Sequence, residues 1–161
     1  MKVYLAGPMT GYLEHNYPAF YAGAACLEQV YGFSVVNPAA LDVLTAEEIE
    51  DHGAEGGLGD GSVLPLYLRR DFKELVHCEG IVLLDGWADS AGANAELSVA
   101  RFLDFEVYTL SERRGWHLWP SDAMPNTGIV RDTWTRFGIP VYQGQRQKER
   151  IKRWASQGAA T

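Results

Sequence analysis

The sequence predicts an α/β fold: a flavodoxin/Rossmann-like single domain with a mainly parallel sheet and helices on both faces. Four short β-rich runs alternate with stretches of helical period, giving a β-α-β-α-β-α-β order. The links between these segments are short, which favours parallel strands joined by helical crossovers. The chain has 161 residues, near the length of one domain. We expect the sheet order 2-1-3-4, plus one extra strand.

The first half of the pattern begins with a strand over residues 2–6 (KVYLA), which stops at Gly7 and the proline after it. Residues 18–31 repeat apolar side chains at spacings of three and four, which predicts a helix that ends at Gly32. Residues 33–36 (FSVV) are expected to form the second strand, because an Asn-Pro pair stops the run.

An irregular, acidic segment follows over residues 39–63, with a short helix expected near residues 45–51. Residues 53–61 hold five glycines in nine positions, a composition that no regular element tolerates. We interpret these nine residues as a loop. Whether the loop is also an active-site lid stays open at this point.

The second half of the pattern starts with a helix over residues 64–78. Residues 80–84 (GIVLL) are continuously apolar, which is typical of a strand buried on both faces. A helix over residues 92–104 and a strand over residues 106–110 complete the alternation. One face of the helix over 64–78 is expected to carry Leu68, Phe72, Leu75 and Val76.

The alternation weakens after residue 110, where four of the five tryptophans lie. We therefore divide the chain into an α/β core over residues 1–110 and a Trp-rich extension over 111–161, packed on the core or at an interface. Helices are expected near 129–137 and 145–155. We interpret the second, basic helix as a solvated amphipathic helix rather than a nucleic-acid arm, because its charge cluster is short and contains Glu149.

The composition excludes several kinds of partner. Lys+Arg 14 against Asp+Glu 21 gives a net charge of −7, which argues against nucleic acid and anionic membrane surfaces as ligands. No apolar run approaches the ~20 residues of a membrane span, and the opening lacks the pattern of a signal peptide.

Cys26 and Cys78 show no CxxC spacing, so buried free thiols are expected, with a disulfide as the minor alternative. We expect a cytoplasmic protein.

Common catalytic motifs are missing from the sequence. The four histidines do not pair at the spacings of metal ligands, and we expect neither a metal nor an organic cofactor. The GxSxG, P-loop and GxGxxG patterns do not occur.

Two small-residue loops follow predicted strands and could approach a ligand. After the strand over residues 80–84, Ser90 and Gly92 stand at a helix start, where backbone N–H groups and the helix dipole favour an anion, and Glu96 follows about one turn later. The plainer interpretation is a Ser90 N-cap and a favourable acid in the first turns. The loop from Gly7 to Gly11 is either an ordinary turn or a close approach to a ligand.

Three short motifs, in order and each near the end of a predicted strand or on a helix beside one, resemble a known family. They are the opening YLAGPMTG (residues 4–11), the helical Arg70-Asp71 pair, and Ser90-x-Gly92-x-x-x-Glu96. Together they resemble the nucleoside 2-deoxyribosyltransferase superfamily. The closer similarity is to its 2'-deoxynucleoside 5'-monophosphate N-glycosidase branch, and phage-type relatives share the AGPMTG opening. The resemblance covers residues 2–110.

The resemblance implies a role for each matching residue. Glu96 matches the catalytic glutamate, a nucleophile on the anomeric carbon, and Asp71 matches the aspartate that assists protonation or binding of the leaving base. From the residues alone, Asp71 would be interpreted as a solvated helix acid paired with Arg70. Ser90 and Gly92 match positions that hold the 5'-phosphate, and Tyr4 matches a tyrosine that lines the sugar site. The loop around the substrate is matched by Gly7, Met9, Thr10 and Gly11.

We therefore expect an enzyme that hydrolyses a 2'-deoxynucleoside 5'-monophosphate to the free base and 2-deoxyribose 5-phosphate. An oxocarbenium-like transition state needs a carboxylate near the anomeric carbon and an acid near the base. Base exchange between nucleosides is the alternative activity, and a nucleotide-binding sensor without turnover is the alternative class.

A homodimer is also expected, because the resemblance implies that a neighbouring subunit completes the phosphate site. Ser121 is the candidate for a serine supplied by that subunit, with the partner's loop over residues 117–128 close to Ser90. Tryptophans in the C-terminal extension also suit an interface, since tryptophan is enriched in interface centres.

Overall fold

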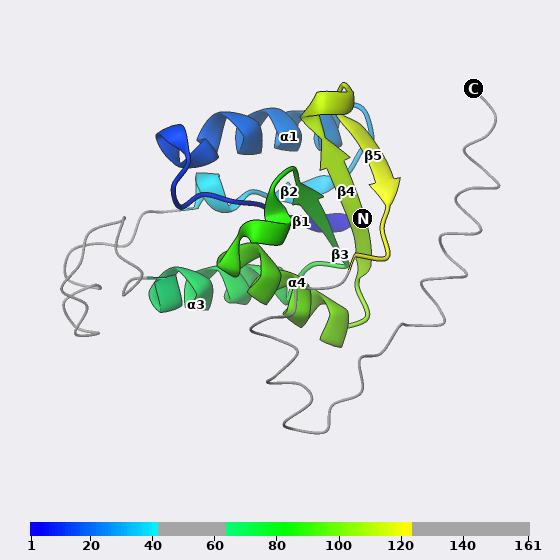
Figure 1. Cartoon of the computed structure of the whole chain (residues 1–161). Helices are drawn as coiled ribbons and strands as arrows, with labels where there is room; N and C mark the ends of the chain where they lie inside the picture. Colours follow the sequence, from blue (N-terminus) through cyan, green and yellow to red (C-terminus); the bar gives the residue numbers. More distant parts are fainter. Residues whose placement is uncertain (42–63, 124–161) are drawn as a thin grey trace.

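The computed structural model describes residues 1–41 and 64–123 (Figure 1). These residues form one five-stranded sheet with the order β2-β1-β3-β4-β5. The strands are β1 (Lys2–Ala6), β2 (Ser34–Val36), β3 (Gly80–Leu84), β4 (Glu106–Ser111) and β5 (His117–Pro120). The α-helices among the described residues are α1 (Tyr17–Gln29), α3 (Leu64–Leu75) and α4 (Ala91–Phe102).

The sheet is mainly parallel. β1 pairs in parallel with β2 and with β3, and β3 pairs in parallel with β4. Among the strands of the described residues, β5 alone runs antiparallel, along β4. The predicted α/β fold class and the strand order 2-1-3-4 with one extra strand are confirmed.

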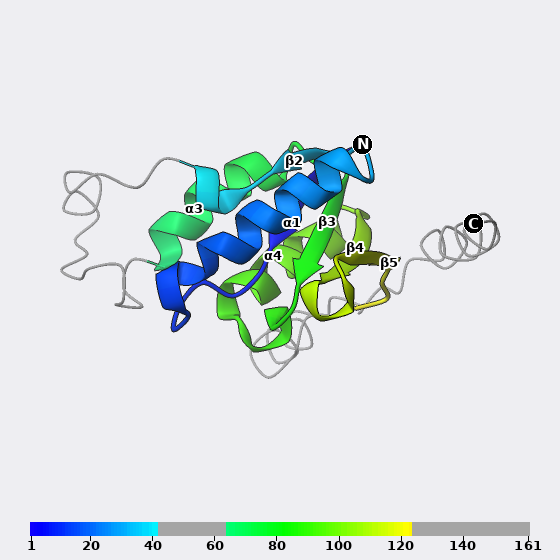
Figure 2. The same ribbon diagram turned by 90° about the horizontal axis from the view of Figure 1, so that it is seen from above.

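Helices cover both faces of this sheet. Figure 1 shows α1 above the strands and α3 and α4 below them, and Figure 2, seen from above, shows α1 in front of the strands. The alternation within β1 explains both layers, because successive side chains of a strand point to opposite faces. Val3 and Leu5 pack with α1, whereas Tyr4 and Ala6 pack on the side of α3 and α4.

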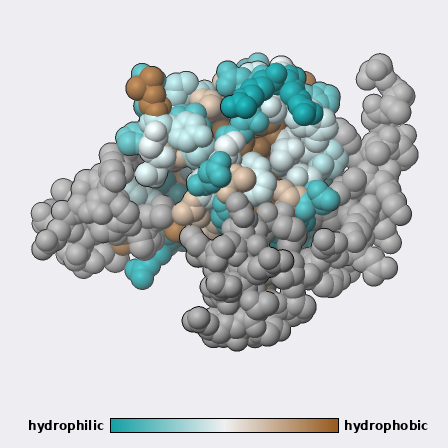
Figure 3. Space-filling model, in the orientation of Figure 1, coloured by the Kyte–Doolittle hydropathy of each residue, from teal (hydrophilic) through white to brown (hydrophobic). Residues whose placement is uncertain are grey.

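The fully buried large apolar side chains lie in these two layers, whereas Leu13, Val30 and Phe102 are among those that stay exposed. The face drawn in Figure 3 is mostly hydrophilic or neutral, and its apolar residues form small separate patches. The prediction that Val76 belongs to the apolar face of this helix is wrong. α3 ends at Leu75, which is fully buried, so Val76 lies beyond the helix and is exposed.

Gly7 has a packing role directly after β1. A Cβ at this position would lie 3.0 Å from Leu84 Cβ and 3.2 Å from the ring of Phe20. A side chain at Gly7 would therefore push apart β1, β3 and α1, in a core that tolerates added volume poorly.

Cys26 and Cys78 are free thiols. Cys78 is part of the apolar core between the sheet and helices α3 and α4. Cys26 packs against the core between the sheet and α1. No helix within residues 1–41 and 64–123 has the length and apolar character to cross a membrane. The same residues contain no group of three or more His, Cys, Asp or Glu side chains that could hold a metal.

Several predicted elements lie outside the described residues: the short helix near 45–51, the glycine loop over 53–61, and the helices near 129–137 and 145–155. Within the described part of the extension, β5 continues the sheet beyond residue 110, and Trp116 packs against the α1 side of the core. The division of the chain at residue 110 stays a prediction.

Candidate functional site

The candidate site lies where neighbouring parallel strands are followed by helices on opposite faces. β1 and β3 are adjacent, and the helix after β1 covers one face while the helix after β3 covers the other. Such a switch point opens a crevice at the carboxyl ends of the strands, where ligands of α/β folds bind. The loops after β1 and β3 both belong to this edge.

Tyr4 and Glu96 form a buried hydrogen bond below this edge. Tyr4 lies on β1 and points toward α4, where its hydroxyl donates to Glu96 Oε1 over 2.7 Å. The exposed fractions are 0% for Tyr4 and 5% for Glu96. None of the described residues donates a hydrogen bond to the second oxygen, Oε2. The contact therefore fixes one carboxyl oxygen of Glu96 and leaves the other available.

Burial controls the protonation of Glu96. Burial is the largest of the effects that together bring the pKa of this carboxyl to about 8. The hydrogen bond from Tyr4 and the charge of Arg70 lower the pKa, whereas the charge of Asp71 raises it. Burial raises the pKa of Tyr4 well above its usual value, and Glu96 and Asp71 add to that rise. Tyr4 therefore stays a hydrogen-bond donor, and Glu96 holds its proton in the ligand-free protein at neutral pH.

Asp71 lies on α3, close enough for its charge to act on Glu96 and Tyr4. Its Oδ1 accepts hydrogen bonds from Arg70 Nε at 2.8 Å and Nη2 at 2.6 Å. Asp71 is only 8% exposed, and burial raises its pKa although Arg70 lowers it. The pairing with Arg70 matches the plain interpretation from sequence, but the carboxyl is buried rather than solvated.

Ser90 and Gly92 begin α4 next to this cluster. Ser90 is the N-cap, and its hydroxyl accepts a hydrogen bond from Ala93 N over 3.3 Å, so the capping interpretation is confirmed. Asn94 Nδ2 donates to the carbonyl oxygens of Ala88 and Ser90, at 3.0 and 2.8 Å. These contacts fix the turn before α4 against the helix. The first N–H groups of a helix have no partner within it, so they are available to an anion.

The loop after β1 contacts the loop after β3. Tyr12 N donates to Met9 O over 3.2 Å, Thr10 is exposed, and Gly11 has a positive φ of 81°. A Cβ on Gly86 would lie 2.6 Å from the Tyr12 hydroxyl and would displace this exposed side chain, and the positive φ of 84° at Gly86 also favours glycine. The two predicted ligand loops therefore meet at one edge of the sheet.

Ser121 lies near the amino ends of the parallel strands, at the opposite end of the sheet from the candidate site. It follows the antiparallel β5, and its N–H donates to Val107 O near the start of β4 over 2.8 Å. Ser90 follows the carboxyl end of β3. Within one chain, the structure does not bring Ser121 to the other predicted site residues, and its supply by a second subunit stays a prediction.

Sequence reasoning missed three residues of this region: Tyr12, Gly86 and Asn94. Each acts through a tertiary or turn contact rather than through a motif. A glycine directly after the acid that ends a strand, and an asparagine inside a first helical turn, are weak signals that could have pointed to Gly86 and Asn94.

Tyr4→Phe is expected to raise the pKa of Glu96 further above its usual value. The Tyr4 hydroxyl stabilises the charged carboxylate, and a hydrogen bond to a charged group contributes about 1.5–3 kcal/mol, so the rise is on the order of one pH unit. Carbon-detected NMR titration of the Glu96 carboxyl measures it. Tyr31→Phe, which removes a hydroxyl that accepts from Leu118 N on the α1 side of the sheet, is the matched control. An unchanged Glu96 titration in Tyr4→Phe would contradict the role given to this contact.

A family model described as "Domain of unknown function (DUF4406)" matches residues 1–109. The matched region runs from β1 into β4 and contains Tyr4, Asp71, Ser90 and Glu96. No curated protein and no solved structure matches the chain.

Proposed function

We propose that this chain, which belongs to the DUF4406 family, is a cytoplasmic N-glycosidase that hydrolyses 2'-deoxynucleoside 5'-monophosphates. The products are the free base and 2-deoxyribose 5-phosphate. One observation carries the proposal: the buried carboxyl of Glu96, held by Tyr4 at 2.7 Å, lies within electrostatic reach of the buried Asp71 at the switch point of the sheet. Two carboxyls in one buried site suit glycosidic bond cleavage.

Glu96 is the nucleophile in this proposal. The ionised form of the carboxyl is the one that reacts: its free Oε2 attacks C1' of the deoxyribose as the bond from C1' to the base nitrogen breaks, and the bonding electrons leave with the base. The positive charge that builds on the sugar is stabilised by the carboxylate. Water then attacks C1' of the glycosyl-enzyme ester, which releases the sugar phosphate and restores Glu96.

Asp71 supplies the proton that the departing base takes up. A general acid has to be protonated before the reaction, and burial raises the pKa of Asp71 in that direction. Arg70 acts against this shift and holds Oδ1, so it orients the carboxyl as well. In the second step, Asp71 takes a proton from the attacking water and returns to its starting state.

The start of α4 supports binding of the 5'-phosphate. Backbone N–H groups around Gly92, together with the helix dipole, favour an anion there. The loop of Gly7, Met9, Thr10 and Gly11 would close around the sugar, since it meets the loop after β3 through Tyr12 and Gly86. A net charge of −7 for the chain makes such local donors necessary for an anionic substrate.

The test is incubation of the purified chain with each of the four deoxynucleoside monophosphates, followed by chromatography. The proposal expects free base and 2-deoxyribose 5-phosphate in equal amounts. A second free base is added in a parallel reaction, and exchanged nucleoside in place of sugar phosphate would favour transferase activity. Nucleotide binding with no free base, unchanged by Glu96→Gln, would show a binding protein and contradict the proposal.

We also propose a homodimer as the functional unit. Ser121 stands away from Ser90 within one chain, so only a second subunit could bring it to the phosphate site. Tyr12 and Leu13, exposed by 48% and 90%, form an apolar rim next to the site that a partner would cover. Light scattering at micromolar concentration is expected to give twice the chain mass of 17.9 kDa. The mass of a single chain would overturn this proposal.

A further inference from the structure

Tyr67 on α3 has a hydroxyl with no role in the fold. Its Oη is buried and lacks a hydrogen-bond partner, and no other buried side-chain oxygen or nitrogen within the described part of the chain shares this property. A buried hydroxyl without a partner costs free energy, because the hydrogen bonds it makes to water are lost and not replaced. Such an atom in a native structure calls for an explanation, and a ligand that supplies the missing partner is one.

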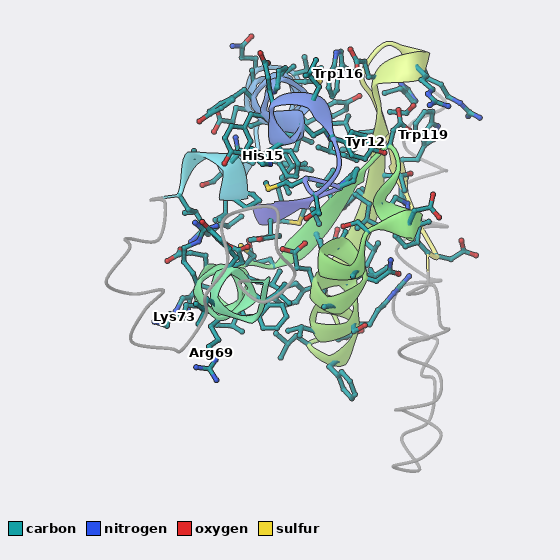
Figure 4. All side chains as sticks on the ribbon, turned by 60° about the vertical axis from the view of Figure 1, so that its left-hand side comes forward. Tyr12, His15, Arg69, Lys73, Trp116 and Trp119 are labelled. Carbon is teal, nitrogen blue, oxygen red and sulfur yellow. The ribbon has the colours of Figure 1, made fainter. Side chains whose placement is uncertain are left out.

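The position of Tyr67 connects it to the candidate site. It precedes Asp71 by four residues, so both side chains lie on one face of α3. The Arg70 guanidinium lies over the Tyr67 ring, 5.1 Å from its centroid. Burial raises the pKa of Tyr67, and the charges of Arg70, Tyr17 and Asp71 act on it as well. The opposite face of α3 carries Arg69 and Lys73, which point away from the protein (Figure 4).

Tyr67 also lies nearer the ligand edge than Asp71. α3 ends just before β3 begins, so its C-terminal end is at the amino ends of the strands, and its first turns are at the carboxyl ends. Tyr67 is in the first of these turns. A ligand that reaches Asp71 from the carboxyl edge therefore passes Tyr67.

We propose that Tyr67 contacts the base of the bound nucleotide, with its hydroxyl donating a hydrogen bond to a carbonyl oxygen or ring nitrogen of that base. The assignment rests on the proposed function, in which Asp71 faces the departing base. Side chains one helical turn apart are about 5–6 Å apart, so Tyr67 and Asp71 are close enough to contact the same base. Tyr67 is then a specificity-determining residue, because a base without an acceptor at this place would leave the hydroxyl unpaired.

Binding to a catalytically inactive background tests this contact without turnover. Glu96→Gln and the double variant with Tyr67→Phe are titrated calorimetrically with each deoxynucleotide and with 2-deoxyribose 5-phosphate, which has no base. Tyr67→Phe is expected to lower the affinity for the best-bound nucleotide roughly tenfold and to leave the affinity for 2-deoxyribose 5-phosphate unchanged. Without ligand, Tyr67→Phe is expected to melt no lower than wild type, since it removes an unpaired hydroxyl, whereas Tyr31→Phe melts lower.

Equal affinities for every nucleotide in the two backgrounds, or an equal loss for nucleotide and 2-deoxyribose 5-phosphate, would overturn the assignment. Different results would refute the proposed glycosidase and the proposed base contact. A wild-type protein that releases no base, with nucleotide binding weakened by Tyr67→Phe, would refute the glycosidase and keep the base contact. Base release with unchanged binding and rate in Tyr67→Phe would refute the contact and keep the glycosidase. A chain that binds no deoxynucleotide would refute both.

Discussion

Glu96→Gln is expected to reduce base release more than about 10⁴-fold, because an amide cannot form the glycosyl ester and the rest of the site cannot replace a nucleophile. The substitution keeps the local structure, since the glutamine oxygen can still accept the hydrogen bond that Tyr4 donates to Oε1. Rates are measured by chromatography of the released base. Glu28→Gln, on the exposed side of α1, is the matched control and is expected to retain full activity.

The same substitution is expected to stabilise the protein at neutral pH. The pKa of Glu96 is about 8 in the folded chain, against an ordinary value of 4.5, so the folded state binds the extra proton between these pH values. Stability therefore falls as pH rises through this window, and a neutral glutamine avoids that loss. The gain is on the order of 3 kcal/mol at pH 7 and falls below about 1 kcal/mol at pH 5. Urea unfolding at both pH values measures it, and an equal gain at pH 5 and pH 7 would contradict the shifted pKa.

Asp71→Asn is expected to slow base release by roughly 10²–10⁴-fold, the usual contribution of a general acid. Asparagine keeps an oxygen that can accept from Arg70 but cannot donate the proton that the base requires. A deoxynucleotide with an N7-methylated purine tests this role, because that base leaves as a neutral molecule without further protonation. In a single turnover, Asp71→Asn should release this base at nearly the wild-type rate, since water attack with Asp71 as the base comes only after the base has left. An equal loss on methylated and unmethylated substrates would mean that Asp71 acts otherwise than as an acid.

Local sequence patterns were sufficient to predict most of the fold. The apolar run of β3 and the helical spacing in α1 are properties of a few adjacent residues, and parallel order follows from their alternation with helices. β5 could be expected only as an unplaced extra strand. Its residues, His117–Pro120, show no clean alternation and end in proline, and they form a strand because they pair with β4.

The candidate site was predictable only in part. Ser90 and Glu96 could be found because their spacing sets them at a helix start, and the N-cap confirms that local interpretation. The bond between Tyr4 and Glu96 joins residues 92 positions apart, which no local pattern encodes. The burial of Asp71 was missed for the same reason: an Arg-Asp pair on a helix is usually solvated, and here packing of α3 against the sheet and α4 removes the carboxyl from water.

The pH dependence of kcat/KM for release of an N7-methylated purine base, measured between pH 5 and 9.5, tests most directly whether Glu96 is the nucleophile. This base leaves without a proton from Asp71, so the ionisation of Asp71 does not enter the profile. This ratio reports ionisations of the free enzyme, where the pKa of Glu96 is about 8. We expect the rate to rise through about pH 8 as Glu96 loses its proton, and Tyr4→Phe to move this rise to higher pH. The second ionisation of the substrate phosphate, near pH ~6, is separated from it because Tyr4→Phe leaves that ionisation unchanged. A rate that falls through pH 8 would contradict the account, because Glu96 would then act as an acid.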